Sequence, residues 1–356
     1  MHKYFEQRLS GIRTKMNKAG IDAFYINHEE NVGYFTAKKG NDCALYITEK
    51  EAFIITDFRY RTMASELDAL EYVETTNSYR TIDFLKSRNE KVIGVEKDFL
   101  PLADYLEFTE VLSNKTIKPV SGLVENLRIY KTEEEIQDIA KAEEISDKSF
   151  MELLDFIKPG ITEKRIAAEL EYLMRCNGSD GVSFDTIAVA GANGALPHGV
   201  PGEKCVEVGE FLTLDFGAMY NGYHADMTRT VAIGGATQEM IDVYNIVLEA
   251  QLNCCNKLHA GISGVEGDAY ARDIIVKAGY GDYFGHGTGH GVGLEIHESP
   301  RTSPAYPGML EENMTITIEP GIYLPGKFGV RIEDLAIVKP NGIINLTSSP
   351  KELIIL

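Results

Sequence analysis

The chain has 356 residues, of which 44% are hydrophobic and 25% are charged, and its formal net charge is −19. This acidic balance argues against nucleic acid as a partner, because phosphates require a basic footprint, and it suits a metal cation or a substrate with a free amine. No apolar run approaches the roughly 20 residues of a membrane helix, and the charged N-terminal residues lack the apolar core of a signal peptide. We therefore expect a soluble, cytoplasmic protein of two domains, since single cores rarely grow beyond about 300 residues.

The five cysteines show no CxxC pairing and leave one residue over in any disulfide scheme. Cysteines arranged in this way are expected to be small buried hydrophobes in a reducing compartment, rather than zinc ligands or a disulfide framework.

The N-terminal third of the chain has the pattern of a mixed α/β unit. Apolar residues at Phe5, Leu9, Ile12 and Met16 follow helical spacing, and Gly20 provides the stop. No phosphate loop or catalytic cluster is visible in this region. Further elements are expected as strands at 23–27, 44–48, 52–56 and 92–95, and as helices from about 59, around 82–87 and at 100–112.

A domain boundary is expected near residues 121–131, directly before a capping box. In Thr132-Glu133-Glu134-Glu135 the threonine hydroxyl can accept from free amides, Glu135 can accept from the backbone of Thr132, and acids are favoured at the positive end of a helix. Ile136, Ala140, Ile145 and Phe150 then mark a long helix that ends at Lys158-Pro159-Gly160.

Further helices are predicted at residues 162–176, 240–258 and 266–278, so the second domain contains two helix pairs. The turn at Asn221-Gly222 favours antiparallel hairpins. The order of two helices, strands, two helices and strands suggests an internal repeat around one curved sheet. The strands are expected at residues 186–190, 211–216, 224–232, 314–319, 330–338 and 352–355.

Four acids stand in or at the ends of apolar, strand-like runs: Asp215, Asp226, Glu319 and Glu333. A hairpin through Asn221-Gly222 brings Asp215 beside Asp226, and two buried like charges require a proton or a cation between them. Alternation places Arg331 and Glu333 on one face of their strand. Acids in runs that ought to be core are informative; such groups are catalytic, metal-binding or exposed at a sheet edge.

The stretch from His286 to Glu298 contains three of the eight histidines of the chain, with glycines between them. Histidine is a metal ligand and proton shuttle near neutral pH, and glycine permits close approach of a ligand or a sharp turn. The alternative is a glycine-rich surface turn with solvated histidines. Together with the four acids, His290 completes a set of nitrogen and oxygen ligands suited to two divalent ions.

Five motifs in order carry a family resemblance: Leu214-Asp215-Phe216-Gly217, Ala225-Asp226-Met227-Thr228-Arg229-Thr230, Gly289-His290-Gly291-Val292-Gly293, Ile318-Glu319-Pro320-Gly321 and Arg331-Ile332-Glu333-Asp334. Through them the chain resembles the proline-specific branch of the pita-bread metallopeptidases (family M24B), which comprises Xaa-Pro dipeptidase, or prolidase, and aminopeptidase P. The N-terminal region, including Thr56-Asp57-Phe58-Arg59-Tyr60, looks like the creatinase-type domain of the family.

The resemblance implies an α+β chain with three parts. A smaller, mixed α/β, creatinase-like domain is expected at residues 1–122, followed by a linker at 123–131. The pita-bread catalytic domain, a curved antiparallel sheet with two pseudo-symmetric helix pairs, is expected at 132–356.

The resemblance also implies a centre of two divalent metal ions per subunit, with Asp215, Asp226, His290, Glu319 and Glu333 as ligands. Asp226 and Glu333 match the bridging carboxylates, and His290 and Glu319 match ligands of the second ion. Oxygen-rich ligation with one imidazole suits Mn²⁺ best, with Co²⁺ or Zn²⁺ as alternatives. Two such ions acidify a water and polarise a carbonyl, and Glu319 matches the acceptor of the proton of that water.

Further residues match the substrate contacts of the family. His198 and His297 match two histidines that steady the substrate carbonyl and its developing oxyanion. Arg331, Tyr323 and His286 match the group that shapes the site around the proline ring. For each histidine and for Tyr323 the alternative is an ordinary core residue, and the glycines near His290 are expected to leave clearance for the bound peptide.

A dipeptidase needs a cation for the C-terminal carboxylate of its substrate, and either Arg301 or Arg331 offers the planar fork that suits it. Arg301 matches an arginine of prolidases, although it could equally be a surface residue. Glu298 and Asp334 flank the candidate site as orienting groups or ordinary hydrogen-bond partners.

The resemblance therefore implies hydrolysis of the bond between an N-terminal residue and a following proline, with Xaa-Pro dipeptides as the favoured substrates. The alternative is an aminopeptidase P that accepts longer peptides. More distant alternatives are a methionine aminopeptidase-like enzyme, which the N-terminal domain and Arg331 argue against, and a non-enzymatic binding protein on the same fold. A homodimer is also expected by resemblance, with no nucleic acid or membrane partner.

Overall fold

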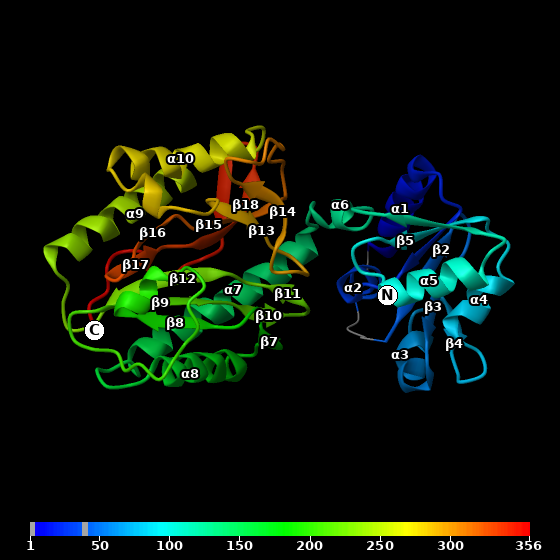
Figure 1. Cartoon of the computed structure of the whole chain (residues 1–356), viewed down its shortest axis with the longest axis horizontal. Helices are drawn as coiled ribbons and strands as arrows, with labels where there is room; N and C mark the ends of the chain where they lie inside the picture. The colour runs from blue at the N-terminus through cyan, green and yellow to red at the C-terminus, as the bar shows by residue number, and fades with distance from the viewer. Residues whose placement is uncertain (1–3, 38–41) are drawn as a thin grey trace. The chain divides into compact units, whose positions relative to one another are not determined.

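The computed structural model describes residues 4–37 and 42–356. Its internal contacts divide the chain into two units with a boundary between Arg128 and Ile129, and both units are drawn in Figure 1. The boundary falls inside the predicted linker, residues 123–131, and helix α6 (Glu125–Arg128) occupies part of that linker. Residues 1–3 and 38–41, which the predicted N-terminal domain includes, lie outside the described residues.

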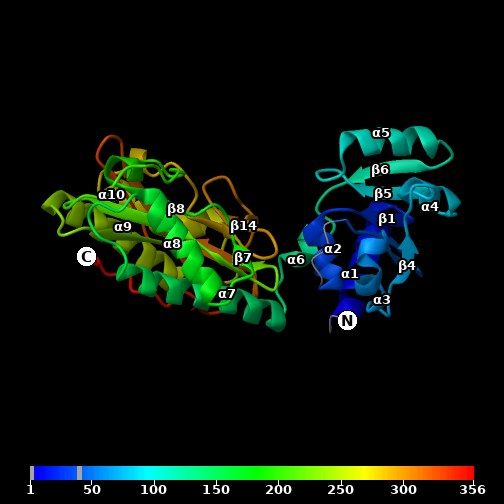
Figure 2. The same ribbon diagram turned by 90° about the horizontal axis from the view of Figure 1, so that it is seen from below.

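The first unit, in its described part, is built on a six-stranded mixed sheet with the order β4-β3-β2-β1-β5-β6. Its elements are α1 (Phe5–Ala19), β1 (Ala23–Ile26), α2 (Glu29–Thr36), β2 (Ala44–Thr48), β3 (Ala52–Thr56), η1 (Phe58–Tyr60), α3 (Arg61–Ser65), β4 (Glu71–Glu74), α4 (Thr81–Ser87), β5 (Val92–Glu96), α5 (Leu102–Val111) and β6 (Thr116–Val120). Every residue of β1, β2 and β3 is buried, which explains their continuous apolar sequences. Figure 2 shows α5 alongside the edge strand β6.

The sequence predicts most of this unit correctly. Phe5, Leu9, Ile12 and Met16 are buried on one face of α1, and Gly20 ends the helix with φ at 63°. The helix expected from about residue 59 is instead the 3-10 turn η1 followed by the short α3. Strands β4 and β6 were not predicted, because both lie at sheet edges and expose part of their residues, which weakens the apolar pattern.

The second unit, residues 129–356, is fully described. Its helices are α7 (Glu133–Leu154), α8 (Glu163–Cys176), α9 (Gln238–Lys257) and α10 (Gly264–Lys277), with the 3-10 turns η2 (Gly191–Ala195) and η3 (Gly281–Tyr283). Its strands are β7 (Gly181–Val182), β8 (Ile187–Ala190), β9 (Phe211–Phe216), β10 (Ala218–Tyr220), β11 (Tyr223–His224), β12 (Met227–Ala232), β13 (Gly289–Gly291), β14 (Glu298–Thr302), β15 (Thr315–Ile318), β16 (Gly321–Leu324), β17 (Phe328–Arg331), β18 (Asp334–Lys339) and β19 (Gly342–Asn345).

The two predicted helix pairs are present, α7 with α8 and α9 with α10. Each pair has its own apolar core, with Phe150 and Leu170 in the first and Val247 and Ile275 in the second. Figure 1 shows the strands of this unit lying between the two pairs. Hydrogen bonding divides these strands into small groups, of which three are three-stranded sheets: β11-β10-β7, β12-β9-β8 and β15-β18-β19.

Two strands that the sequence predicts as continuous, 224–232 and 330–338, are broken at an acid, and the strand predicted at 314–319 ends just before its acid, Glu319. Asp226 lies between β11 and β12, Glu319 between β15 and β16, and Glu333 between β17 and β18. The strand ends at Arg331, yet the expected placement holds, because Arg331 and Glu333 line the same cavity whereas Ile332 lies in an apolar core. Residues 352–355, also predicted as a strand, form only an isolated bridge between Ala232 and Ile355.

The cysteines differ in burial, with Cys43 and Cys254 buried and Cys176 and Cys205 exposed. The expectation of buried cysteines therefore holds for only part of the set. Among the helices within residues 4–37 and 42–356, none combines the length and the apolar character that a membrane span requires.

Helix α7 begins with the predicted capping box. Thr132 N donates to Glu135 Oε2 at 2.7 Å, and Glu135 N donates to Thr132 Oγ1 at 3.4 Å. The buried face runs through Ile139, Ile145 and Phe150, so only part of the predicted stripe is correct. The helix ends at Leu154, before the predicted stop at Lys158.

We expect Thr132→Ala to lower the free energy of unfolding of the second unit by about 1 kcal/mol, because the amide of Glu135 loses its acceptor. Denaturant unfolding followed by circular dichroism measures the change. Thr132→Ser keeps the hydroxyl and is the matched control, expected to stay close to the parent. A Thr132→Ala protein as stable as the parent would contradict a stabilising role for the cap.

Candidate metal centre

One cavity of about 590 Å³ is lined by every residue that the sequence singles out as a ligand, catalytic group or substrate contact. These residues are Asp215, Asp226, His290, Glu319, Glu333, His198, His297, Arg331, His286, Tyr323 and Arg301. They come from β9, β13, β14, β16 and β17 and from the breaks between strands. The fold therefore brings distant segments of the chain to one place.

The strand β13, which carries His290, packs closely against the main chain of neighbouring segments. A Cβ atom on Gly289 would lie 1.8 Å from the carbonyl oxygen of Thr317, and one on Gly291 would lie 2.4 Å from that of Ser299. Glycine is required at both positions because the main chains approach closely. These glycines therefore allow the close packing that positions His290. The sequence instead predicted that they leave clearance for a bound peptide.

Three side chains form the tightest group of candidate ligands. One ligand atom from each of Asp226, His290 and Glu333 lies within 4.8 Å of the other two, and all three residues are buried. His290 Nε2 lies 3.4 Å from Asp226 Oδ2 and 3.4 Å from Glu319 Oε1. Neighbouring ligands of an ion bonded at about 2.1 Å lie roughly 3.0–3.4 Å apart, so these separations suit donor atoms around a shared cation.

The tautomer of His290 also suits metal binding. Its Nδ1 lies 3.1 Å from the carbonyl oxygen of Gly291, which can only accept, so Nδ1 carries the proton. The lone pair of Nε2 then faces Asp226 and Glu319. Burial, followed by the nearby His297, lowers the pKa of His290 to about 3, so the ring is neutral at physiological pH.

The acids in the cavity repel one another. Burial, followed by the charges of neighbouring carboxylates, raises the pKa of Asp226 and of Glu333 well above ordinary values. Burial also raises the pKa of Glu319 to about 8, with Asp215 adding to the rise and Arg331 opposing it. A divalent cation among these groups would offset the repulsion, because it favours the ionised carboxylates.

Asp215 provides a further test of whether a cation fits. Its Oδ2 accepts from Arg331 Nη2 at 2.5 Å. Its Oδ1 is buried and, among the residues that the structure describes, accepts no hydrogen bond. A buried carboxylate oxygen needs a partner, and a divalent ion would supply one on the side of the cavity. The four acids and His290 therefore have the chemistry and placement of a cation site.

Arg331 connects several of these groups and is itself buried. In addition to its hydrogen bond to Asp215, Arg331 donates from Nη1 to the Tyr323 hydroxyl at 2.8 Å and from Nε to Thr228 Oγ1 at 2.9 Å. The Tyr323 hydroxyl in turn lies 2.8 Å from His286 Nε2, whose Nδ1 lies 2.8 Å from the carbonyl oxygen of Gly287. Proton positions are consistent along this chain, because Arg331 donates to Tyr323 and Tyr323 donates to His286.

Three cationic or imidazole groups surround the mouth of the cavity. His198 and His297 are exposed, and the His297 ring lies 4.5 Å from the His290 ring at an interplanar angle of 69°. Burial, followed by the charge of Arg301, lowers the pKa of His297 from its ordinary value. Arg301 is exposed on β14, directly opposite His290 in the β13–β14 register. All three residues are exposed and line the cavity, so a molecule bound there can contact them.

The sequence analysis missed the role of Thr228. Its hydroxyl donates to Glu333 Oε2 at 2.6 Å, and its carbonyl oxygen accepts from Glu333 N at 3.1 Å. Thr228 stands two residues after Asp226 inside a motif that the sequence analysis quoted, so the period of two along a strand could have indicated it. Its partner, Glu333, is far away in the sequence, and only the fold shows the contact.

We expect the metal-free protein to lose stability as pH rises from about 4.5 toward 8. The ordinary pKa of a glutamate is 4.5 and that of Glu319 is about 8, so the folded state binds this proton more tightly than the unfolded state. The contribution of this bound proton to the free energy of unfolding is complete below pH 4.5 and disappears as Glu319 ionises. Thermal unfolding of metal-stripped protein across this interval measures the effect.

Glu319→Gln is the control, because the amide cannot ionise. Its unfolding temperature should fall less over the same pH interval than that of the parent. Equal pH dependence in the two metal-free proteins would contradict a raised pKa at Glu319.

Comparison with known proteins supports these observations. Residues 137–340 match the model of metallopeptidase family M24, and residues 8–130 match the creatinase/prolidase N-terminal domain. The chain is 39% identical over 351 residues to the Xaa-Pro dipeptidase of Pyrococcus furiosus, which covers 98% of this chain and 100% of that protein.

Two known structures of similar proteins extend the comparison. The Xaa-Pro dipeptidase from Bacillus anthracis is 42% identical with a TM-score of 0.96, covering 99% of this chain and 100% of its own. The X-Pro aminopeptidase from Thermotoga maritima is 39% identical with a TM-score of 0.90, covering 96% and 100%. The predicted family and fold class are thereby confirmed: the chain belongs to metallopeptidase family M24 and carries a creatinase/prolidase N-terminal domain.

Proposed function

We propose that the protein is a metal-dependent exopeptidase that hydrolyses Xaa-Pro dipeptides. The observation that carries the proposal is the meeting of four carboxylates and one neutral imidazole in a single cavity. The similarity to an Xaa-Pro dipeptidase over nearly the full length of both chains supports the choice of substrate. The proposal includes the expected cytoplasmic location and homodimer.

Asp215, Asp226, His290, Glu319 and Glu333 would hold two divalent ions, with Asp226 and Glu333 shared between them. The position of His290 Nε2, at 3.4 Å from both Asp226 and Glu319, supports their joint use around one ion. The buried Oδ1 of Asp215 supports its use around the other. Carboxylates with a single imidazole suit Mn²⁺ first, with Co²⁺ and Zn²⁺ as alternatives.

Two bound divalent ions would supply an acidified water and a polarised substrate carbonyl. In the proposed reaction the Glu319 carboxylate accepts the proton of the attacking water and passes it to the leaving proline nitrogen. His198 and His297, at the mouth of the cavity, donate hydrogen bonds to the carbonyl oxygen as negative charge develops on it. Arg331 holds Asp215 and Tyr323 in place, and the Tyr323–His286 pair forms the wall near the proline ring.

The two arginines considered as partners of the substrate carboxylate differ in exposure and in the hydrogen bonds that they already make. Arg331 is buried and already donates to Asp215, Tyr323 and Thr228. Arg301 is exposed and lines the same cavity. An exposed guanidinium can meet a carboxylate in the bidentate geometry that arginine favours, so the proposal assigns this contact to Arg301.

The second candidate is an aminopeptidase P that removes the first residue from longer peptides with proline in second position. The similarity to an X-Pro aminopeptidase at 39% identity favours it. The two candidates differ in what lies beyond the proline. A dipeptidase gains from a cation that binds the terminal carboxylate, whereas an aminopeptidase must leave that path open.

We expect the metal-loaded protein to release alanine from Ala-Pro and to act poorly on Ala-Pro-Ala and Met-Ala-Ser. Arg301→Ala should raise KM for Ala-Pro by about 10- to 100-fold, because a charge-assisted hydrogen bond contributes roughly 1.5–3 kcal/mol. Steady-state release of the first residue, with Mn²⁺, Co²⁺ or Zn²⁺ added to metal-stripped protein, provides the measurement.

Arg165→Ala is the matched control, since Arg165 is a surface arginine on α8 that pairs with Glu169 away from the cavity lining. It should leave KM unchanged. Equal turnover of the tripeptide would favour aminopeptidase P, and preference for the methionyl peptide would overturn the proline assignment. Full activity of Asp226→Asn or Glu333→Gln would contradict the metal-dependent reaction itself.

A further inference from the structure

Thr228 occupies a position between a guanidinium and a carboxylate of the proposed metal centre. It is fully buried on β12. Its hydroxyl lies 2.9 Å from Arg331 Nε and 2.6 Å from Glu333 Oε2. Thr228 does not line the cavity, so it does not contact a bound peptide and acts only through its neighbours.

The direction of both hydrogen bonds is fixed by chemistry. A guanidinium can only donate, so the Thr228 hydroxyl accepts from Arg331. The single hydroxyl proton is then directed to Glu333 Oε2, which accepts it. Because Arg331 also donates to Asp215 Oδ2, the two acids Asp215 and Glu333 are tied together through Arg331 and Thr228.

The backbone around this contact is held from the side away from the cavity. Glu333 N donates to the carbonyl oxygen of Thr228 at 3.1 Å. Arg229 Nη1 donates to the carbonyl oxygens of both Thr228, at 2.9 Å, and Glu333, at 2.5 Å. Arg229 is buried and joins β12 to the chain segment between β17 and β18 at the position of the acid.

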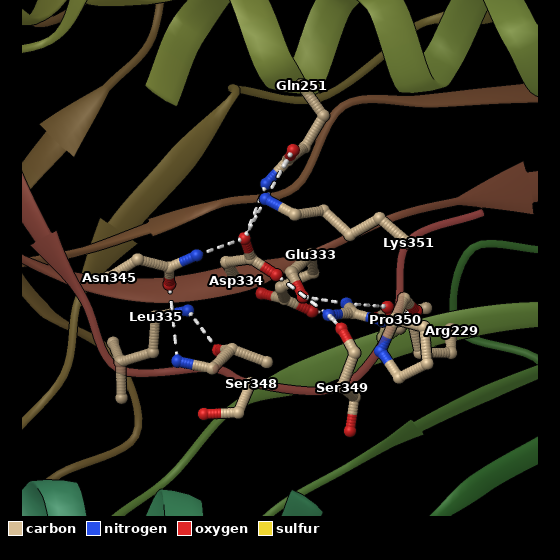
Figure 3. A network of polar contacts seen from close by, with 12 residues as sticks. Arg229, Gln251, Glu333, Asp334, Leu335, Asn345, Ser348, Ser349, Pro350 and Lys351 are labelled. Carbon is tan, nitrogen blue, oxygen red and sulfur yellow. Dashed lines mark hydrogen bonds and ion pairs between the residues drawn. The ribbon is translucent and has the colours of Figure 1, made fainter. Parts of the chain in front are cut away.

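Arg229 is itself fixed by a buried network, which Figure 3 shows. Its Nη2 donates to Asp334 Oδ1 at 2.9 Å and to the carbonyl oxygen of Ser349 at 2.8 Å. The other oxygen of Asp334 accepts from Lys351 at 2.5 Å, Asn345 at 2.7 Å and Gln251 at 3.0 Å. Both partners of the Arg229–Asp334 pair are thus hydrogen-bonded, and Arg229 links this network to the main chain that carries Thr228 and Glu333.

We propose that Thr228 is a positioning residue for the metal centre, whose hydroxyl sets the rotation of the Glu333 carboxylate before an ion binds. The inference rests on the proposed function, in which Glu333 is a shared ligand. A carboxylate already held in its binding orientation loses less conformational freedom when an ion arrives. Removal of such an outer partner typically weakens metal binding by roughly 10- to 100-fold.

The test compares Mn²⁺ binding to metal-stripped parent, Thr228→Val and Thr228→Ser by isothermal titration calorimetry. Valine has nearly the shape of threonine without its hydroxyl, and serine keeps the hydroxyl. We expect Thr228→Val to bind Mn²⁺ roughly 10- to 100-fold more weakly than the parent, and Thr228→Ser to restore most of the affinity. Parental affinity in Thr228→Val would overturn the proposal, as would an equal loss in Thr228→Ser.

Thr213→Val is the matched control for loss of a buried hydroxyl. Thr213 lies on the neighbouring strand β9, and its hydroxyl is 3.2 Å from that of Thr230. Among the described residues it contacts no carboxylate through that hydroxyl. Thr213→Val should therefore lose thermal stability to an extent similar to Thr228→Val while keeping parental Mn²⁺ affinity, and an equal loss of affinity would overturn the proposal.

Thr228→Ala provides a second variant if the valine protein does not fold, and the same loss of Mn²⁺ affinity is expected from it. The test also separates this inference from the proposed function. A parent that binds no divalent ion would overturn the metal centre and the inference together. A parent that binds ions but does not cleave Ala-Pro would contradict the substrate assignment. The comparison of Mn²⁺ affinities between the parent and the Thr228 variants would still decide the role of Thr228.

Discussion

The repulsion among the acids of one cavity is the constraint on which the site depends. Asp226 and Glu333 are buried and Glu319 is half-buried, and burial together with neighbouring charge raises the pKa of each. Such an arrangement is unfavourable unless protons or cations neutralise it. The proposed metal-binding role would explain why the chain keeps these acids together, and the neutral His290 beside them would add a ligand without adding charge.

The fold meets this constraint by breaking its strands where the acids occur. Asp226, Glu319 and Glu333 each fall between two strands, so their side chains reach the cavity without leaving unpaired positions inside a ladder. The close packing of β13 at Gly289 and Gly291 brings His290 to the same place. Behind the cavity, the Arg229–Asp334 pair joins the segments that carry Thr228 and Glu333. The apolar cores of the two helix pairs support this arrangement from both sides.

Several parts of the fold and of the candidate site could be predicted from the sequence, because they depend on residues that are neighbours along the chain. The cap at Thr132, the stop at Gly20 and the turn at Asn221-Gly222 each depend on neighbouring residues, and all three are present. The candidate ligands could be recognised because acids inside apolar runs are unusual, and the structure places them all in one cavity.

Other features depend on contacts between distant segments, which a sequence pattern does not encode. The strand break after Arg331 is one example, because the alternation of apolar and polar residues continues across it. The role of Gly289 is another, since it follows from the carbonyl oxygen of Thr317. The contact of Thr228 with Glu333 likewise joins residues more than a hundred positions apart, as the sequence separation of 105 shows.

The central claim is that these five side chains hold two divalent ions. Anomalous X-ray diffraction from crystals of metal-stripped protein soaked in Mn²⁺, recorded above and below the manganese absorption edge, tests it most directly. Two neighbouring peaks are predicted in the cavity, both in contact with Asp226 and Glu333, one also with Asp215 and the other with His290 and Glu319. No peak in the cavity, or peaks bound to other residues, would contradict the claim.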